Sequence, residues 1–300
     1  MGALSDDPKP MSAVLDLAAP LPVPAPVAKT AAHGEAGDAS APSLASPATA
    51  VLAGASVLLV LLWLAIAMYL VEEKKSSYAH AEVTAGNIAR AMEEHTRRTV
   101  RAIDQTAIFV KQQEEQLGKK FDLEAYAREG AFLDRFFNLI GVIDADGWFF
   151  KSTPSLPRSL LKDREHFRVH LDKDDVGLFI SKPVIGRSSG KWSVQFTRRI
   201  NRPDRSFGGV LVASLDPNYF SELYKSMNVS AAGVITLVGT DGIVRARSTG
   251  SMTDAGQDLK GSQLFRHLEQ NGDIGSYFGP SEIDGVKRLY SYRRLRDYPL

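Results

Sequence analysis

The sequence predicts an α+β protein in which a transmembrane helix and a long amphipathic helix precede two similar antiparallel-sheet units. Three observations support this prediction. Residues 50–71 are uncharged and mostly apolar, and residues 72–118 keep apolar side chains at helical spacing. From residue 137 onward, short strand-like runs are separated by turn signals such as Asp146-Gly147 and Asp241-Gly242.

Composition excludes several classes of function. The chain has 36 Lys and Arg against 35 Asp and Glu, so no strong overall field favours nucleic acid as a partner. Cysteine is absent, which excludes disulfides, Cys-ligated zinc, iron–sulfur clusters and thiol nucleophiles. The chain contains no G-x-S-x-G, no H-E-x-x-H and no P-loop, and "GRSSGK" lacks the Walker spacing. A hydrolase is therefore the least favoured function, and no cofactor is predicted.

The first 71 residues form a tail and a membrane anchor. Residues 1–49 are rich in Ala, Pro and Ser and cannot bury enough apolar surface to fold, so we expect them to be disordered. The 22 residues 50–71 are long enough to cross a hydrocarbon core of roughly 30 Å. The alternative, a buried globular helix, is disfavoured by the abrupt change to "EEKKSS". The run is too long and too far from the N-terminus for an ordinary cleaved signal peptide.

Charge alone gives a weak indication of membrane orientation. Lys74 and Lys75 follow the apolar run, whereas residues 30–49 contain no Lys or Arg. The positive-inside rule therefore favours a cytoplasmic location for the C-terminal side. The signal consists of two lysines, and Glu72 and Glu73 lie directly beside them.

Residues 72–120 are expected to form a single stalk helix, which would span on the order of 70 Å. Its apolar stripe is narrow, so the helix must pack along a tall surface or against a second copy of itself, and a helix-mediated homodimer is predicted. A change of phase after Met92 argues against a strict coiled coil. The stripe comprises Ala81, Ala85, Ile88 and Met92, followed by Val100, Ile103, Ala107 and Val110.

The region after residue 120 contains an internal repeat with an offset of 95 residues. Ungapped alignment pairs "VIDADG" with "LVGTDG", and "SGKWSVQFTRRI" with "DGVKRLYSYRRL". It gives eight identities in 59 positions, where chance would give about three or four. The identities are Asp146/Asp241, Gly147/Gly242, Asp163/Asp258, Gly177/Gly272, Ser181/Ser276, Gly190/Gly285, Arg198/Arg293 and Arg199/Arg294. We therefore predict two sheet units, residues 121–228 and 229–300, stacked along the long helix.

The repeat also separates scaffold residues from ligand-binding candidates. Arg198 and Arg199 recur in the second copy and are interpreted as structural. Arg187 and Trp192 align with Glu282 and Lys287, so they are specific to the first copy. The segment "DREHFRVHL" is also specific to it, since Arg164, His166, Phe167 and His170 align with Leu259, Gly261, Ser262 and Phe265.

These motifs resemble a known family of receptors. An anchor, a long helix and two PAS-like units that carry "DREHF", "PVIGRSSGKW" and "GGVLVASLDPNYF" resemble the double Cache sensor domains of bacterial membrane receptors. The sequences of these motifs are most similar to the Cache regions that precede diguanylate cyclase and phosphodiesterase domains. Histidine kinases and chemoreceptors use the same module. The resemblance covers residues 72–300.

The resemblance implies a location and an architecture. It places residues 72–300 in the periplasm, anchored by a single span in the inner membrane, which contradicts the charge count and is preferred to it. It implies that residues 121–228 form the membrane-distal unit and 229–300 the membrane-proximal unit. Family members continue into a second membrane span and a cytoplasmic output domain, so this chain is expected to be a fragment or a truncated form that ends inside the second unit.

The resemblance also guides the choice of ligand. Amino-acid-binding members carry an Arg, a Trp-Tyr pair, a Tyr and an Asp after a Pro, and a late Asp. Arg164 matches the Arg, but His166-Phe167 replace Trp-Tyr, Val184 and Gly186 stand where Tyr and Asp are expected, and "LVAS" replaces the late Asp. Without carboxylates to receive an ammonium group, an α-amino acid is a poor candidate.

We therefore predict a site in the distal unit for a small anion such as a carboxylate. Guanidinium groups hold oxyanions in bidentate geometry, and aromatic faces can wall such a pocket. The candidates are Arg164, His166, Phe167, Arg187 and Trp192, with Lys191 as a further cation. Trp192 alternates with Val194 and Phe196, so a core position is equally open. His166 and His170 have helical metal-ligand spacing, but no third ligand is suitably placed and no metal is predicted.

The predicted function is that of a non-enzymatic sensor, in which ligand binding shifts the sheets against the long helix and biases a dimer. The alternatives are a sensor for a histidine kinase or chemoreceptor rather than for a cyclic-di-GMP enzyme, and a membrane-anchored structural module without a ligand. A ligand-induced rise in melting temperature would distinguish a sensor from a structural module.

Overall fold

The computed structural model describes residues 47–130, 137–171, 173, 176–226, 229, 233–248 and 254–300. Most of the predicted disordered tail, residues 1–49, lies outside these ranges; only residues 47–49 are described, and they begin the first helix. The chain divides into two compact units, Met1–Leu64 and Ala65–Leu300, and the second unit contains all of the strands.

The first helix, α1, is a continuous element from Pro47 to Leu117. The predicted membrane span, residues 50–71, and most of the predicted stalk helix, residues 72–120, lie in this one helix, because the junction "VEEKKSS" contains neither Pro nor Gly to interrupt it. α1 ends where Gly118 takes a positive φ of 54° and begins the 3-10 turn Gly118–Lys120. An 18-residue window of α1 has a mean hydropathy of 2.6 and no buried residue, as a membrane span requires.

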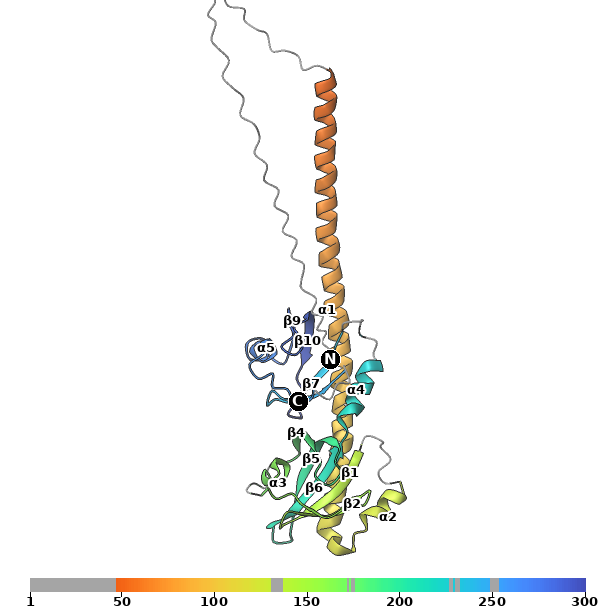
Figure 1. The fold of residues 1–300 in the computed structure, drawn as a ribbon, viewed down its shortest axis with the longest axis vertical. Helices are drawn as coiled ribbons and strands as arrows, with labels where there is room; N and C mark the ends of the chain where they lie inside the picture. The colour runs from red at the N-terminus through yellow and green to blue at the C-terminus, as the bar shows by residue number, and fades with distance from the viewer. Residues whose placement is uncertain are drawn as a thin grey trace, which may run out of the picture. The chain divides into compact units, whose positions relative to one another are not determined.

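The first group of strands forms one six-stranded antiparallel sheet (Figure 1). The strand order is β3-β2-β1-β6-β5-β4, so the last strand of the group lies at the centre, between β1 and β5. The short helices α2 (Leu123–Arg128) and α3 (Glu165–Arg168) flank this sheet. The strands are β1 (Phe137–Asp144), β2 (Trp148–Thr153), β3 (Ser159–Leu160), β4 (Phe179–Ile185), β5 (Trp192–Asn201) and β6 (Phe207–Leu215).

The two faces of this sheet contact different parts of the molecule, because successive side chains of a strand point to opposite faces. On one face, Leu211, Ala213 and Leu215 of β6 pack with apolar residues of α1. The α1 residues that are buried include Met92, Val100, Ile103, Ala107 and Val110, as the helical spacing predicts. On the other face, Val210 and Val212 pack with Phe149, Leu161 and Phe167 in a separate cluster. This second face is the one available for a ligand.

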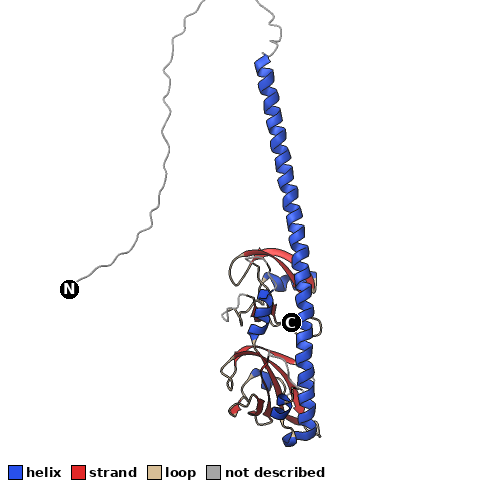
Figure 2. Ribbon diagram, turned by 90° about the vertical axis from the view of Figure 1, so that its right-hand side faces the viewer, coloured by secondary structure: helices blue, strands red, loops and turns tan. Residues whose placement is uncertain are grey.

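The second group of strands lies beside the same helix (Figure 2). It follows α4 (Pro217–Ser226) and consists of two antiparallel hairpins, β7 (Thr236–Val238) with β8 (Val244–Arg247), and β9 (Ile274–Pro280) with β10 (Lys287–Arg293). Helix α5 (Gln263–Asn271) connects the hairpins. Among the described strands, none takes the central position between β7 and β10 that β6 takes between β1 and β5.

The strand positions agree with the predicted repeat. β9 and β10 begin 95 residues after β4 and β5. The turns between them also match: Gly190 donates its N–H to the Gly186 carbonyl, and Gly285 donates to the Ser281 carbonyl, each at 2.8 Å. Arg198 and Arg293 both bind acids of α1, Asp104 and Glu93. These contacts support the interpretation of Arg198 and its repeat partner Arg293 as scaffold residues.

The ungapped alignment is wrong around α3. Leu161 N–H donates to the Gly147 carbonyl and Leu259 N–H to the Gly242 carbonyl, so the offset here is 98 residues rather than 95. The helix N-caps, Arg164 and Ser262, show the same offset. Asp163 and Asp258 are therefore not equivalent. In the corrected register Phe167 corresponds to Phe265, which makes Phe167 a shared residue.

Candidate ligand-binding site

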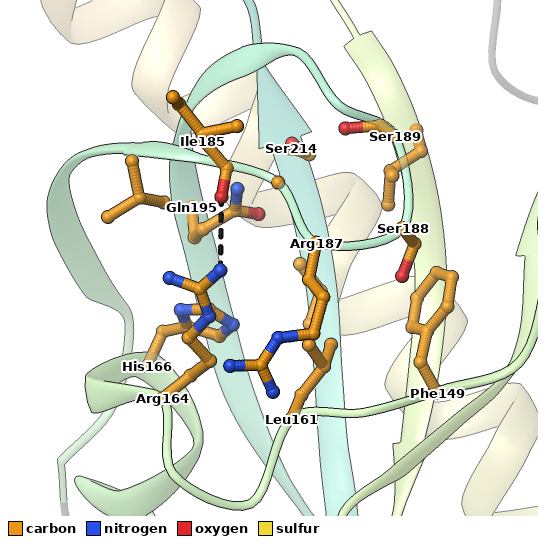
Figure 3. Close-up of a pocket in the computed structure, with 14 residues that line it drawn as sticks. Phe149, Leu161, Arg164, His166, Ile185, Arg187, Ser188, Ser189, Gln195 and Ser214 are labelled. Carbon is orange, nitrogen blue, oxygen red and sulfur yellow. Dashed lines mark hydrogen bonds between the residues drawn. The ribbon is translucent and has the colours of Figure 1, made fainter.

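The first sheet carries a pocket on the face that is turned away from α1 (Figure 3). The pocket is open to solvent on one side, and its cavity volume is about 30 Å³, enough for about two water molecules. The floor is formed by β1, β6 and β5, one side by α3 and the segment before it, and the mouth by the loop after β4. The lining residues are Leu139, Phe149, Leu161, Arg164, His166, Val184, Ile185, Gly186, Arg187, Ser188, Ser189, Gln195, Val212 and Ser214.

The floor is built by the sheet register. Leu139, Ser214 and Gln195 are direct partners across β1, β6 and β5, so their side chains form one row on the pocket face. Gly141, in the next row, leaves the space that the Phe149 ring occupies, since a Cβ there would lie 2.5 Å from the ring. The floor is therefore apolar at β1 and polar at β5 and β6.

Arg164 and Arg187 both line the pocket. Arg164 is the N-cap residue of α3, and its Nη2 donates to the Ile185 carbonyl at 3.1 Å. In Figure 3 the Arg187 side chain lies beside it. Arg187 makes a bidentate ion pair with Asp163, with both N–O distances 2.8 Å, and also donates to the Leu160 carbonyl.

The charges of these two arginines are compensated differently. The Arg187 hydrogen bonds lower the pKa of Asp163 to about 2, so that the Arg187–Asp163 pair remains ionised and neutral overall at ordinary pH. No ion pair of Arg164 is found among the described residues. The lining contains no Asp or Glu. Two arginines and the one carboxylate of Asp163 therefore leave a net positive charge, and Arg164, which Asp163 attracts only at longer range, is the arginine without a direct ion pair among the described residues.

His166 is a neutral member of the pocket. Its side chain is almost fully buried, and this burial lowers its pKa to about 4, with a smaller contribution from the Arg164 charge. Burial likewise lowers the pKa of His170 to about 4, and its Nε2 lies 2.9 Å from the Thr197 hydroxyl. Among the described residues, no three His, Asp or Glu side chains are placed to hold a metal.

Phe167 and Trp192 do not line the pocket. Phe167 is fully buried in the cluster around Val210, and its ring meets the Phe207 ring in a T-shaped arrangement with the ring centroids 5.4 Å apart. Trp192 is 39% exposed at the start of β5, and its carbonyl accepts a hydrogen bond from Asn138. Lys191 also lies outside the lining, and its backbone closes the mouth loop through Gly186 and Ser189.

Two polar floor residues, Gln195 and Ser214, are absent from the sequence-based candidates. Both are nearly inaccessible to bulk solvent, at 5% and 1% exposure. The Ser214 hydroxyl has no hydrogen-bond partner among the described residues. The sequence signal was available, because Ser214 interrupts the apolar alternation of "GGVLVASL" at a position in phase with Val210 and Val212.

Comparison with known proteins identifies the type of domain. Residues 217–300 match a family model described as "dCache_1_like: Histidine kinase sensor domain". The extracellular domain of rpHK1S-Z16, which is assigned as a histidine kinase, superposes with a TM-score of 0.68 at 26% identity, covering 74% of this chain and 92% of that one. No curated protein matches the sequence.

Two ligand-binding domains share the fold at lower identity. The ligand-binding domain of the Pseudomonas fluorescens chemoreceptor CtaA, in complex with L-isoleucine, has a TM-score of 0.55 at 12% identity and covers 76% of this chain and 91% of that one. The ligand-binding domain of Mlp24 with asparagine has a TM-score of 0.51 at 15% identity, with 74% and 91% covered. None of these names identifies a diguanylate cyclase, so the predicted link to cyclic-di-GMP enzymes is not confirmed. The resemblance itself is confirmed: residues 217–300 match a double Cache family model, and the fold is that of the extracellular and ligand-binding domains named above.

Proposed function

We propose that this chain is a membrane-anchored periplasmic sensor that binds a small anion in the pocket of residues 121–228. A single span, residues 50–71, anchors it in the bacterial inner membrane. The similar structures are extracellular and ligand-binding domains, which supports the periplasmic location of residues 72–300. The proposal includes the division into two sheet units, residues 121–228 and residues 229–300.

The observation that carries the proposal is the uncompensated charge of Arg164. A guanidinium group that lines a pocket without a carboxylate attracts an anion, and it can hold a carboxylate through two parallel hydrogen bonds. The related structures named above hold amino acids, whose ammonium group needs acceptors. The pocket has no carboxylate, and the Ile185 carbonyl already accepts from Arg164. A ligand without an ammonium group fits this lining better.

Binding of organic anions to the full chain in detergent tests the proposal. We expect saturable binding at pH 7 and, at a ligand concentration of 100 Kd, a stabilisation of about 2.7 kcal/mol in thermal melts. Arg164→Ala should abolish binding. Arg168→Ala is the matched control, because Arg168 is an exposed residue of the same helix outside the pocket. Equal binding by both variants would remove Arg164 from the site.

The output is proposed to be a cytoplasmic domain for cyclic-di-GMP synthesis or breakdown. A histidine kinase output is the second candidate, and the family match and the rpHK1S-Z16 domain favour it. Assays of the native gene product for ATP-dependent autophosphorylation and for conversion of GTP to cyclic-di-GMP separate the two.

A homodimer through α1 is also proposed, because exposed apolar residues such as Tyr78 and Val83 continue along the helix beyond residue 71. Light scattering of the detergent-solubilised chain should give a dimer mass. Val83→Glu should reduce it to the monomer, and a monomeric unmodified chain would contradict the proposal.

A further inference from the structure

The polar floor of the pocket indicates more about the ligand than its charge. Ser214 and Gln195 are direct partners across β6 and β5, so their side chains lie next to each other on the pocket face. Both are at least nine-tenths buried, and both line the cavity. The Ser214 hydroxyl is without a hydrogen-bond partner among the described residues. A buried hydroxyl left unpaired is unfavourable, which is the expected state of a group that a ligand pairs.

The chemistry of the floor differs from that of the mouth. Ser214 and Gln195 are uncharged, and each can both donate and accept a hydrogen bond. His166, next to Arg164 in the lining, is neutral at physiological pH and adds one donor and one acceptor. The uncompensated cation is Arg164, beside the mouth carbonyl of Ile185. The pocket therefore offers a cationic end and a neutral hydrogen-bonding end.

The remaining lining restricts size. Leu139, Phe149, Leu161 and Val212 form the apolar part of the pocket, and the cavity volume is about 30 Å³. The mouth loop is held by the exposed Arg187–Asp163 pair and by a partly buried Ser188–Ser159 hydroxyl contact of 2.6 Å. A space of about two waters between apolar walls favours a ligand with a short carbon chain.

We propose that the ligand is a short-chain hydroxy or oxo carboxylate, whose carboxylate binds Arg164 and whose hydroxyl or carbonyl oxygen binds Ser214 and Gln195. This inference rests on the proposed function of the same pocket and specifies its ligand. Hydrogen bonding to the floor provides the discrimination, because an analogue without the oxygen leaves the buried Ser214 hydroxyl unpaired. An α-amino acid of the same skeleton is rejected, since its ammonium group would take the place of the hydroxyl at the uncharged floor, where no carboxylate lines the pocket to pair with it.

Four acids with one carbon skeleton test the inference: lactate, pyruvate, propionate and alanine, titrated calorimetrically into the full chain at pH 7. Lactate or pyruvate should bind about tenfold more tightly than propionate, the effect of one net hydrogen bond. Alanine should show no binding. Ser214→Ala should reduce the preference over propionate to less than about threefold. Ser214→Ala should also keep the unmodified melting temperature, because it removes a hydroxyl that has no protein partner.

Ser193→Ala is the matched control, because Ser193 is a fully buried serine of β5 outside the lining. It should leave the preference unchanged. Equal affinity for lactate, pyruvate and propionate, all dependent on Arg164, would overturn the inference and leave the anion sensor intact. An unchanged preference in Ser214→Ala, or tightest binding of alanine, would also overturn it. Absence of binding by all of the acids, and by the wider anion panel, would overturn both proposals.

Discussion

Removing Arg198 should destabilise the folded unit through its contact with α1. Arg198 donates to Asp104 from Nε at 2.6 Å and from Nη2 at 2.8 Å, so the pair is bidentate. The two side chains are only 21% and 16% exposed. Arg198→Ala leaves the Asp104 carboxylate largely shielded from water and without its cation.

The magnitude follows from this geometry. Hydrogen bonds to charged groups contribute about 1.5–3 kcal/mol, and breaking a fully buried pair costs about 3–5 kcal/mol. Since the Asp104 pair is partly exposed, we expect a loss of about 2–3 kcal/mol. For a unit of this size, each kcal/mol corresponds to about 2–4 °C, so the melting temperature should fall by about 4–12 °C.

Circular dichroism melting of the chain in detergent measures this loss. Arg98→Ala is the control, because Arg98 contacts Glu94 at 2.6 Å on the same helix but is 78% exposed. That variant should melt close to the unmodified chain. Adding Asp104→Ala to Arg198→Ala should cause little further loss, because the unpaired carboxylate is then gone. Equal shifts for Arg198→Ala and Arg98→Ala would refute the reasoning.

Three further predictions concern the pocket and its surroundings. His166 and His170 bind protons more weakly in the folded state, where both have pKa values of about 4. Their contribution to the free energy of unfolding should therefore be fully present above pH 6.5 and fall as the pH drops toward 4. In melts at a series of pH values, the double variant with Gln at both positions should lose most of this pH dependence. Phe167→Ala should lower stability by about 3–5 kcal/mol, as in other buried aromatic truncations, whereas Trp192→Ala should have a much smaller effect in denaturant titrations. Asp163→Asn should tighten anion binding at low salt, because it removes the carboxylate that pairs with Arg187. Calorimetry at two salt concentrations measures the change. An affinity of this variant equal to or lower than that of the unmodified chain would contradict the prediction.

Much of the fold could be predicted from local pattern. The runs "FNLIGVID" and "FGGVLVASL" coincide with β1 and β6, because alternating apolar residues bounded by turns specify a strand directly. The run "IGSYFGP", which forms β9, does not specify a strand in this way, because two Gly residues and a Pro obscure the pattern. The predicted membrane span and stalk differ in hydropathy but belong to one continuous helix, α1.

The candidate site was only partly predictable, because the repeat was aligned without a gap. The second copy has three additional residues before α5, so Arg164, His166 and Phe167 were compared with the wrong partners. The correct register moves Phe167 into the scaffold and leaves Arg164 and His166 specific to the first unit. Sequence spacing also could not show that Asp163 pairs with Arg187, since that contact joins the turn before α3 to a distant loop.

The position of Ser214 suggests how the pocket communicates with the rest of the molecule. β6 is the central strand, and its alternate residues Ala213 and Leu215 pack in the same cluster as Met92 and Ile103 of α1. α4 begins directly after β6, at Pro217. A ligand that pulls on Ser214 therefore acts on a strand whose opposite face is fixed to the helix that carries the membrane anchor.

The same cluster continues into the second group of strands. Phe220 and Tyr224 of α4 join Leu237 of β7 and Ala246 of β8 in one contiguous core. Because packed cores transmit displacement rather than absorb it, we expect ligand binding to change the protection of residues 217–226 as well as the pocket. Hydrogen–deuterium exchange with and without ligand measures both regions. Protection confined to the pocket strands, with α4 unchanged, would show that β6 does not couple the pocket to the second group of strands.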